Sequence, residues 1–204
     1  MTDLTDLIVA EHERIRRLFS ALEDVASYTS RQAGRRGPQL LEESWARLAA
    51  LITAHAEAER QVLYPALAAA VPGRAAPPGH GGLLECVEQV SAHPPGSPAW
   101  RRAVAAARAA ARTQFSAEEQ VLLDFRQCTD RVRREALGQQ WAVLGARPPR
   151  GARRQLRSAG LTADRLRQPA RDDEAGQSAG PPGRQPVTAA TGVLERADGA
   201  AGRR

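Results

Sequence analysis

The sequence predicts an all-α protein: an antiparallel up-down-up-down four-helix bundle with a short fifth helix and a disordered C-terminal tail. Three observations support this fold class. Apolar residues recur every three or four positions through four long segments, which is typical of amphipathic helices. Short polar or Pro/Gly-rich links separate these segments, as in simple bundles. Composition and charge change after Gly145, so we expect a bundle over residues 1–145 and a tail over 146–204.

The first helix is predicted from about Leu4 to Ser27, and the second from about Pro38 to Ala69. Both are rich in residues that favour helix. Pro65 is expected to kink the second helix or to end it early, because proline cannot continue a regular helix. The predicted inward faces of the two helices contain Leu4, Ile8, His12, Ile15, Phe19 and Leu22, and then Leu48, Ile52, His55, Glu59 and Val62.

The second half of the bundle follows a loop predicted over residues 71–79, where proline and glycine exclude helix. A third helix is expected from near His80, with Leu84, Val87 and Val90 on its inner face, and it ends at His93. A fourth runs from about Pro98 to Cys128, and a short fifth from Arg131 to Gly145. The inner face of the fourth helix is predicted to contain Val104, Ala107, Ala111, Gln114, Glu118, Val121 and Phe125.

The tail carries all of the excess charge. Residues 1–145 contain 17 Arg and 17 acidic residues, whereas residues 146–204 contain 12 Arg and 6 acidic residues, which accounts for the net charge of +6. The tail has few large apolar residues, so we expect it to be disordered. A basic tail can contact nucleic acid, but this one has no aromatic residues to stack on bases, which favours a solubilising extension.

We expect a cytoplasmic protein with no membrane contact. The sequence has no run of 18 apolar residues, as a membrane-spanning helix requires. The N-terminal segment lacks the basic and apolar regions of a signal peptide. Cys86 and Cys128 are then expected to stay reduced, and because their spacing fits no metal motif, we interpret both as packing residues.

Polar residues interrupt the apolar faces of all four long helices. His55 and Glu59 are four residues apart, so both project to the same part of the core. A buried imidazole and a buried carboxylate each need a partner. A metal ion provides one for both, while a single His–Glu hydrogen bond inside the core is the simpler alternative. His12 alone would also be read as a core histidine.

The levels of these polar residues favour a single site. Counting residues from the shared end of each helix, at 1.5 Å per residue, places four positions within roughly 8 Å of one level: His12, His55, His80 and Gln114. Glu59 and Glu118 each lie one turn further along. Independent polar groups have little reason to converge on one layer. His93 lies among prolines, about 20 Å beyond His80 along a helix, and is expected at the surface.

Three stretches of the chain resemble the hemerythrin-like, or HHE cation-binding, family. The first is Asp-Leu-Ile-Val-Ala-Glu-His-Glu-Arg-Ile-Arg-Arg-Leu-Phe over residues 6–19. The second and most specific is His55-Ala-Glu-Ala-Glu59 followed by Val-Leu-Tyr-Pro. The third is Glu118-Glu119 followed by Val-Leu-Leu, and Gly138 and Trp141 fit the usual C-terminal extension. The resemblance covers about residues 1–145.

This resemblance implies a four-helix bundle that holds a non-haem di-iron centre. By the resemblance, the histidine ligands would be His12, His55 and His80, and the bridging carboxylates would be Glu59 and Glu118. The chain departs from the family pattern at Gln114, where the family has histidine, and at Leu84, where some members have a second histidine. These departures weaken the expected site.

The leading functional hypothesis is an iron-binding protein that binds or senses O2, NO or a related oxidant. The alternative is a degenerate, metal-poor bundle that acts as a protein interaction module. An oxidase or peroxidase using the same site is a third reading. The sequence indicates no dedicated substrate pocket and no catalytic residue, which favours a non-enzymatic role.

Overall fold

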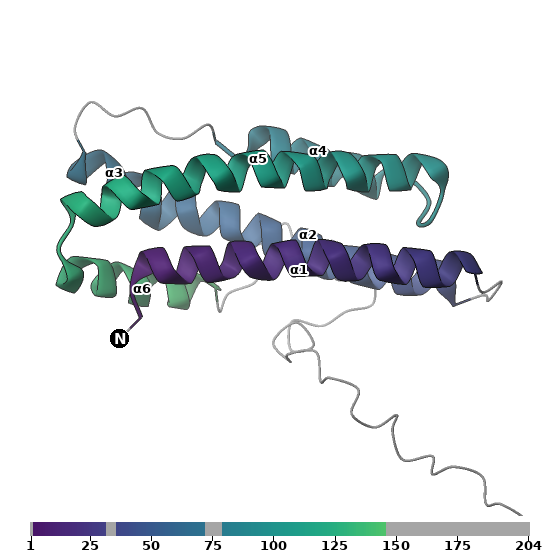
Figure 1. The fold of residues 1–204 in the computed structure, drawn as a ribbon, viewed down its shortest axis with the longest axis horizontal. Helices are drawn as coiled ribbons and strands as arrows, with labels where there is room; N and C mark the ends of the chain where they lie inside the picture. The colour runs from purple at the N-terminus through teal and green to yellow at the C-terminus, as the bar shows by residue number, and fades with distance from the viewer. Residues whose placement is uncertain (1, 32–35, 72–78, 146–204) are drawn as a thin grey trace, which may run out of the picture. The chain divides into compact units, whose positions relative to one another are not determined.

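The structure, a computed structural model, describes residues 2–31, 36–71 and 79–145, and every regular element in these ranges is a helix (Figure 1). The elements are α1 (Leu4–Arg31), α2 (Gly37–Ala58), η1 (Glu59–Leu63), α3 (Tyr64–Ala70), α4 (Gly81–Ser91), α5 (Pro98–Cys128) and α6 (Arg131–Gly145). The predicted all-α fold class is confirmed. The predicted tail and the loop over 71–79 lie largely outside the described residues, so the division of the chain at 145 stays a prediction.

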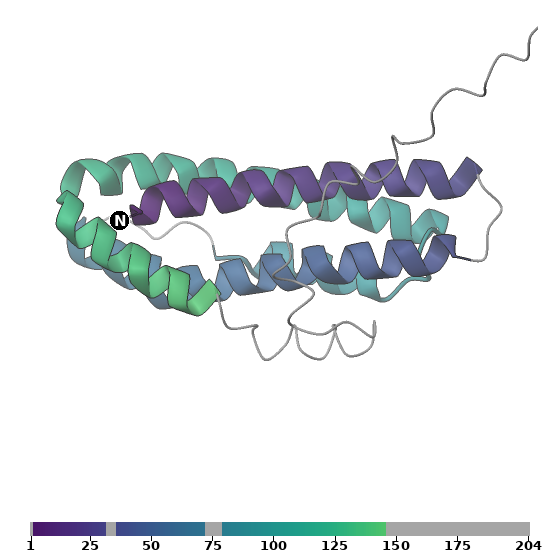
Figure 2. The ribbon, with the colours of Figure 1, turned by 90° about the horizontal axis from the view of Figure 1, so that it is seen from below.

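Four members form the bundle: α1, the continuous segment from α2 through η1 to α3, then α4, and finally α5. Successive members run in opposite directions (Figures 1 and 2). Helix α1 packs against α2 and against α5, and α4 packs against α5 and α2. The last helix, α6, lies across one end of the bundle, where it packs against α1 and α2.

The second member contains one wide turn, η1, in which backbone hydrogen bonds join residues five apart. The amide of Tyr64 donates to the carbonyl of Glu59. Pro65 follows at once, in the first turn of α3. In a regular helix its ring would clash with the carbonyl four residues earlier, and a widened turn relieves that clash. The predicted early end at Pro65 is therefore wrong, because the chain continues as helix to Ala70. The predicted kink stays a prediction.

The third member is much shorter than the others. His80 is the N-cap residue of α4, which confirms the predicted start near His80. Leu83, not Leu84, is fully buried on the inner face, together with Val87 and Val90. The helix begins at Gly81, so His80 stands at the start of α4.

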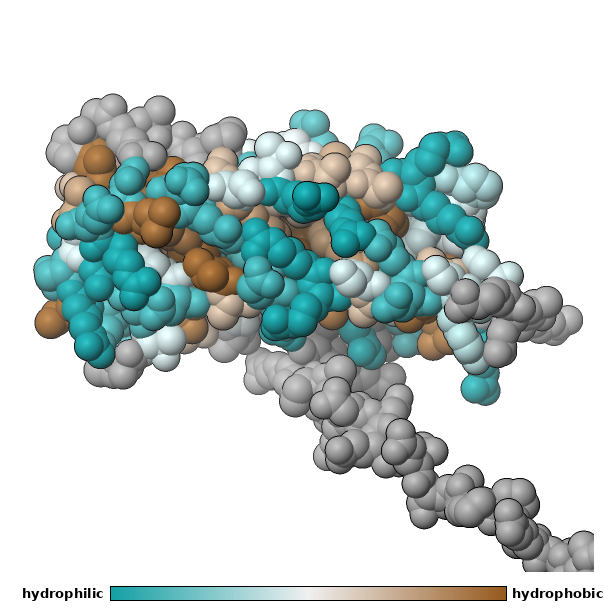
Figure 3. Space-filling model, viewed as in Figure 1, coloured by the Kyte–Doolittle hydropathy of each residue, from teal (hydrophilic) through white to brown (hydrophobic). Residues whose placement is uncertain are grey.

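Two apolar clusters fill the interior, and a polar layer separates them. The outer face of the bundle is mostly polar (Figure 3). One cluster includes Ile15, Ile52 and Ala111, and the other includes Ile8, Val62 and Val121. The long helices pass from one cluster to the other through the positions that the sequence predicted to be polar and buried. The buried polar residues of this layer are His12, His55, Glu59, His80, Gln114 and Glu118.

The structure confirms some of the remaining predictions about helix faces, helix ends and the two cysteines, and it contradicts others. The predicted inward faces of α1, α2 and α5 are buried throughout, and Asp3 caps α1 by accepting the amide of Thr5. The first helix extends to Arg31, beyond the predicted end. Cys86 is partly buried against the core, but Cys128 is exposed, so its interpretation as a packing residue is wrong. In the described ranges, no helix is long and apolar enough to cross a membrane.

Candidate metal centre

The structure brings all six predicted polar residues into one layer. His12 comes from α1, His55 from the last turn of α2, and Glu59 from the start of η1. His80 caps α4 in the same layer, and α5 contributes Gln114 and Glu118 one turn apart. Four of them are 0–1% exposed, His80 is 5% exposed and Gln114 is 8% exposed. His93 lies beyond the end of α4 and is partly buried.

Two carboxylates lie among three imidazoles. Glu118 Oε2 is 3.2 Å from His12 Nε2 and 3.9 Å from His55 Nε2, and its Oε1 is 3.2 Å from His80 Nε2. Glu59 Oε1 is 3.4 Å from His55 Nε2, and Glu59 Oε2 is 3.7 Å from His80 Nδ1. The Nε2 atoms of His12 and His55 are 3.2 Å apart. Glu118 therefore contacts every histidine of the layer.

Three buried atoms of this layer form no hydrogen bond of good geometry with the described residues, although each has a nitrogen or oxygen neighbour at 3.2–3.4 Å: Glu59 Oε1, His80 Nε2 and Glu118 Oε2. Leaving such an atom unpaired costs about 1–3 kcal/mol. A cation can satisfy all three. Ligand atoms from His12, His55, Glu59 and Glu118 lie within 4.8 Å of one another, and His80 contacts the same two carboxylates. Imidazole nitrogen and carboxylate oxygen together suit a transition metal, so the residues present fit such an ion.

The outward nitrogens of two histidines meet further carboxylates. His12 Nδ1 is 3.0 Å from Glu119 Oε1, to which Arg16 also donates at 2.8 Å. His55 Nδ1 is 3.1 Å from Glu11 Oε2. When each Nδ1 carries the proton and donates it, each Nε2 faces the layer as a free acceptor. Metal-binding histidines in proteins are commonly oriented in this way.

Comparison with known families then identifies the domain. The family model described as the hemerythrin HHE cation binding domain matches residues 3–125. This chain belongs to the hemerythrin family. The matched range contains the whole polar layer, from His12 to Glu118. Comparison with curated proteins gave no match, and comparison with solved structures gave none.

The electrostatics of this hemerythrin-like layer favour positive charge. Burial alone would raise the pKa of Glu118, but contacts with His12 and His55 outweigh it and hold the pKa far below its usual range. Burial alone would lower the pKa of His55, but contacts with Glu11 and other carboxylates raise it well above the ordinary value. A metal ion can take the place of such protons, since ligands must lose theirs to bind it.

Gln114 stands at the position where the family resemblance leads us to expect histidine. Its Nε2 donates a hydrogen bond to Glu118 Oε1 at 2.5 Å, within the buried layer. The amide nitrogen thus donates to the carboxylate. In this hemerythrin-like chain α5 contributes one carboxylate, Glu118, and no imidazole.

Aromatic rings enclose the layer. Phe115 stacks on His12 with ring centroids 4.1 Å apart and the planes 10° from parallel. Trp141 from α6 meets His55 edge to face, with centroids 5.6 Å apart. Both rings are buried, so they keep water away from the two imidazoles.

Sequence reasoning missed four residues around the layer. Glu11 and Glu119 orient the histidines, and Arg16 holds Glu119 in place. Tyr64 donates to Glu59 Oε2 at 3.0 Å, and its hydroxyl lies 3.3 Å from His80 Nδ1. The signal available in the sequence was adjacency, since the two glutamates neighbour His12 and Glu118. Nothing in the helical pattern indicates Tyr64, because it lies five positions after Glu59 and so off its face of a regular helix.

Proposed function

We propose that this hemerythrin-like protein holds non-haem iron in the polar layer and, through it, binds or senses O2, NO or a related oxidant. His12, His55 and His80 would be the nitrogen ligands, and Glu59 and Glu118 the carboxylate ligands. Iron, when bound, would supply redox chemistry and a position for a diatomic ligand.

The observation that carries this proposal is the set of unpaired buried atoms on Glu59, His80 and Glu118. A core selected only for stability would have little reason to keep three such atoms side by side, because each costs free energy. They come from three segments of the chain and lie where both clusters of apolar side chains end. A cation in this layer is the simplest common partner.

The surrounding residues would prepare the layer before an ion arrives. Glu11 and Glu119 hold the imidazoles of His55 and His12 in the orientation that metal binding needs. Tyr64 keeps its proton, because burial and the charge of Glu59 raise its pKa above the ordinary value. It therefore remains a donor to Glu59 and restricts how that carboxylate turns.

Gln114 supports a second candidate function, the metal-poor interaction module. Its amide satisfies Glu118 Oε1 without any ion. A chain that had lost its metal could keep the bundle through such substitutions. The two candidates differ in one measurable quantity, the metal content of the purified protein.

The test is metal content in His55→Ala. His55 contacts both carboxylates of the layer, so its loss should reduce iron affinity by at least tenfold, given that even the outer partners of metal ligands contribute about 10–100-fold. Iron per chain is measured after anaerobic loading with Fe(II), alongside circular dichroism to show that the variant is folded.

His93→Ala is the matched control, because it removes the one histidine outside the layer. It should leave the iron content unchanged. A folded His55→Ala protein that binds as much iron as the parent chain would remove the metal-site assignment. Parent protein that takes up no iron at all would favour the interaction module.

A further inference from the structure

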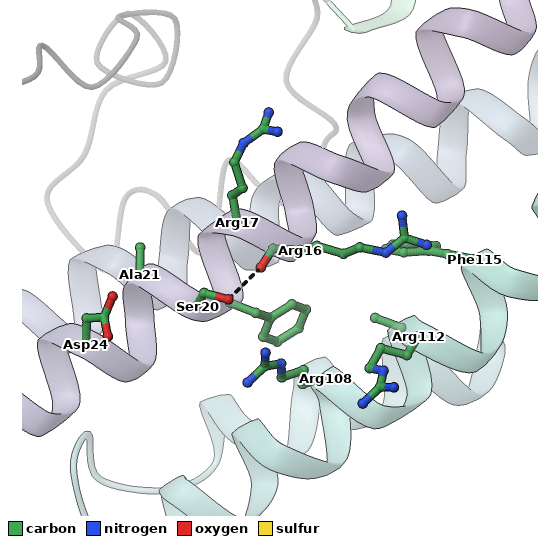
Figure 4. Close-up of a pocket in the computed structure, with 10 residues that line it drawn as sticks. Arg16, Arg17, Ser20, Ala21, Asp24, Arg108, Arg112 and Phe115 are labelled. Atoms are coloured by element: carbon green, nitrogen blue, oxygen red, sulfur yellow. Dashed lines mark hydrogen bonds between the residues drawn. The ribbon is translucent and has the colours of Figure 1, made fainter.

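A basic groove lies between α1 and α5 (Figure 4). It has a volume of about 460 Å³, which is within the usual range for small-molecule sites. Four arginines line it, Arg16 and Arg17 from α1 and Arg108 and Arg112 from α5. Asp24 is the single acidic side chain among the ten lining residues.

The arginines of the groove are only partly neutralised. Arg108 forms an ion pair with Glu23, and Arg16 is paired with Glu13 and Glu119. Arg112 has no ion pair with any described residue. It lies one turn from Arg108 on α5, so both guanidinium groups can reach one ligand. Arg17 stands at the outer rim and points away from α5 (Figure 4).

The bottom of the groove is apolar. Phe19, Ala111 and Phe115 are buried there, and they offer no side-chain hydrogen-bonding group. The guanidinium carbon of Arg16 lies 5.7 Å from the centre of the Phe115 ring, a distance at which the cation attracts the ring face. The methylene stems of the arginines form the walls. The groove thus offers positive charge at its rim and hydrocarbon below.

We propose that this groove binds a small organic oxyanion, a molecule with a phosphate or carboxylate group attached to an apolar body. Guanidinium groups recognise both kinds of oxyanion through paired hydrogen bonds. The volume exceeds what a bare phosphate ion needs, and the apolar bottom suits an attached ring or chain. The groove contains none of the six polar-layer residues, although Phe115 and Arg16 contact both the groove and the surroundings of His12. The recognition of an oxyanion by Arg108 and Arg112 does not require a metal ion in the layer.

The test uses the full-length, metal-free protein and two probes, phenyl phosphate and inorganic phosphate, in calorimetric titrations at low and at moderate salt. Phenyl phosphate should bind more tightly than inorganic phosphate. The double variant Arg108→Gln/Arg112→Gln should weaken phenyl phosphate about tenfold or more, since hydrogen bonds to charged groups are the strong ones. Benzoate in place of phenyl phosphate tells whether a carboxylate serves as well as a phosphate.

The matched control is Arg126→Gln/Arg102→Gln on the same helix. Arg126 pairs with Asp6 of α1 as Arg108 pairs with Glu23, and Arg102 is exposed without an ion pair among the described residues, as Arg112 is. The control therefore removes the same charge and one equivalent ion pair. Equal weakening in the two double variants would reveal nonspecific attraction to a basic protein. Equal affinity for both phosphates, or no heat at millimolar ligand, would also overturn the proposal.

Discussion

Gln114→His introduces the histidine that the family resemblance leads us to expect at this position, and its effect separates the two candidate functions. Without metal, the variant should be less stable than the parent. The Gln114 amide is 2.5 Å from Glu118, whereas the imidazole of His55, also four residues before a carboxylate, is 3.4 Å from Glu59. The new histidine should therefore contact Glu118 less closely than the amide does.

The size of the loss follows from that contact. A hydrogen bond to a charged group contributes about 1.5–3 kcal/mol. For a bundle of this size, such a loss corresponds to a fall of roughly 5–10 °C in Tm. Bound metal should turn this loss of stability into a gain. An ion present at about 100 times its Kd adds about 2.7 kcal/mol to the free energy of unfolding, and the new imidazole should tighten binding by adding a ligand on α5.

The assay is thermal melting by circular dichroism, with and without Fe(II), on samples whose iron content is also measured. In the metal-binding case the variant melts lower without iron, recovers with iron and approaches two ions per chain, as in di-iron carboxylate bundles. Gln114→Leu is the control, because it loses the same amide without gaining a ligand, so iron should not rescue it more than the parent. A Gln114→His protein that is destabilised with and without iron, and gains no metal, would refute the iron-binding proposal.

Two further predictions concern the contact between α6 and the start of α1. Gly138→Ala should lower the free energy of unfolding by about 1–3 kcal/mol, because the new Cβ would lie 2.3 Å from the carbonyl oxygen of Thr2. Gly145→Ala is the control and should be neutral or slightly stabilising, because a Cβ there has no neighbour within 4 Å. Equal melting temperatures for the two variants would contradict the predicted clash at Gly138. Asp3→Asn should destabilise the protein at pH 7, because hydrogen bonds from Arg134 and Thr5 outweigh burial and hold the pKa of Asp3 below its usual range. This stabilisation is present above the unfolded pKa, about 3.8, and is lost as the pH falls towards and through the lower folded pKa. The difference in Tm between parent and variant should therefore begin to shrink below about pH 4 and vanish only at still lower pH, and a difference that does not shrink on acidification would show that charge is not its cause.

The amino-acid sequence is sufficient to predict the faces of the long helices and the level of the site. Helical periodicity decides which residues point inward, and a rise of 1.5 Å per residue converts sequence position into height along a bundle. Those two regularities are enough to put His12, His55, Glu59 and Glu118 in one layer. Helical periodicity and rise per residue do not depend on the details of side-chain packing, so predictions that rest on them alone agree with the structure.

The outer partners of the layer could not be predicted in the same way. Glu11 and Glu119 each lie next to a core position, at the edge of the inward face, where the side chain can turn to solvent or to the interior. Neighbouring helices make that choice: Glu11 meets a histidine on α2, and Glu119 meets one on α1. His80 lies at the start of α4, as predicted, and there it contacts both carboxylates of the layer.

The wide turn η1 explains how Tyr64 reaches Glu59. In a regular α-helix, residues three and four apart share a face, and a residue five apart does not. Joining residues five apart brings Tyr64 back over Glu59 after a single turn, and its hydroxyl can then bond the carboxylate. Pro65 disfavours the regular alternative at this point. Pro65 therefore favours the wide turn, and the wide turn places the Tyr64 hydroxyl where it can bond Glu59. The same turn brings that hydroxyl close to His80 at the start of α4.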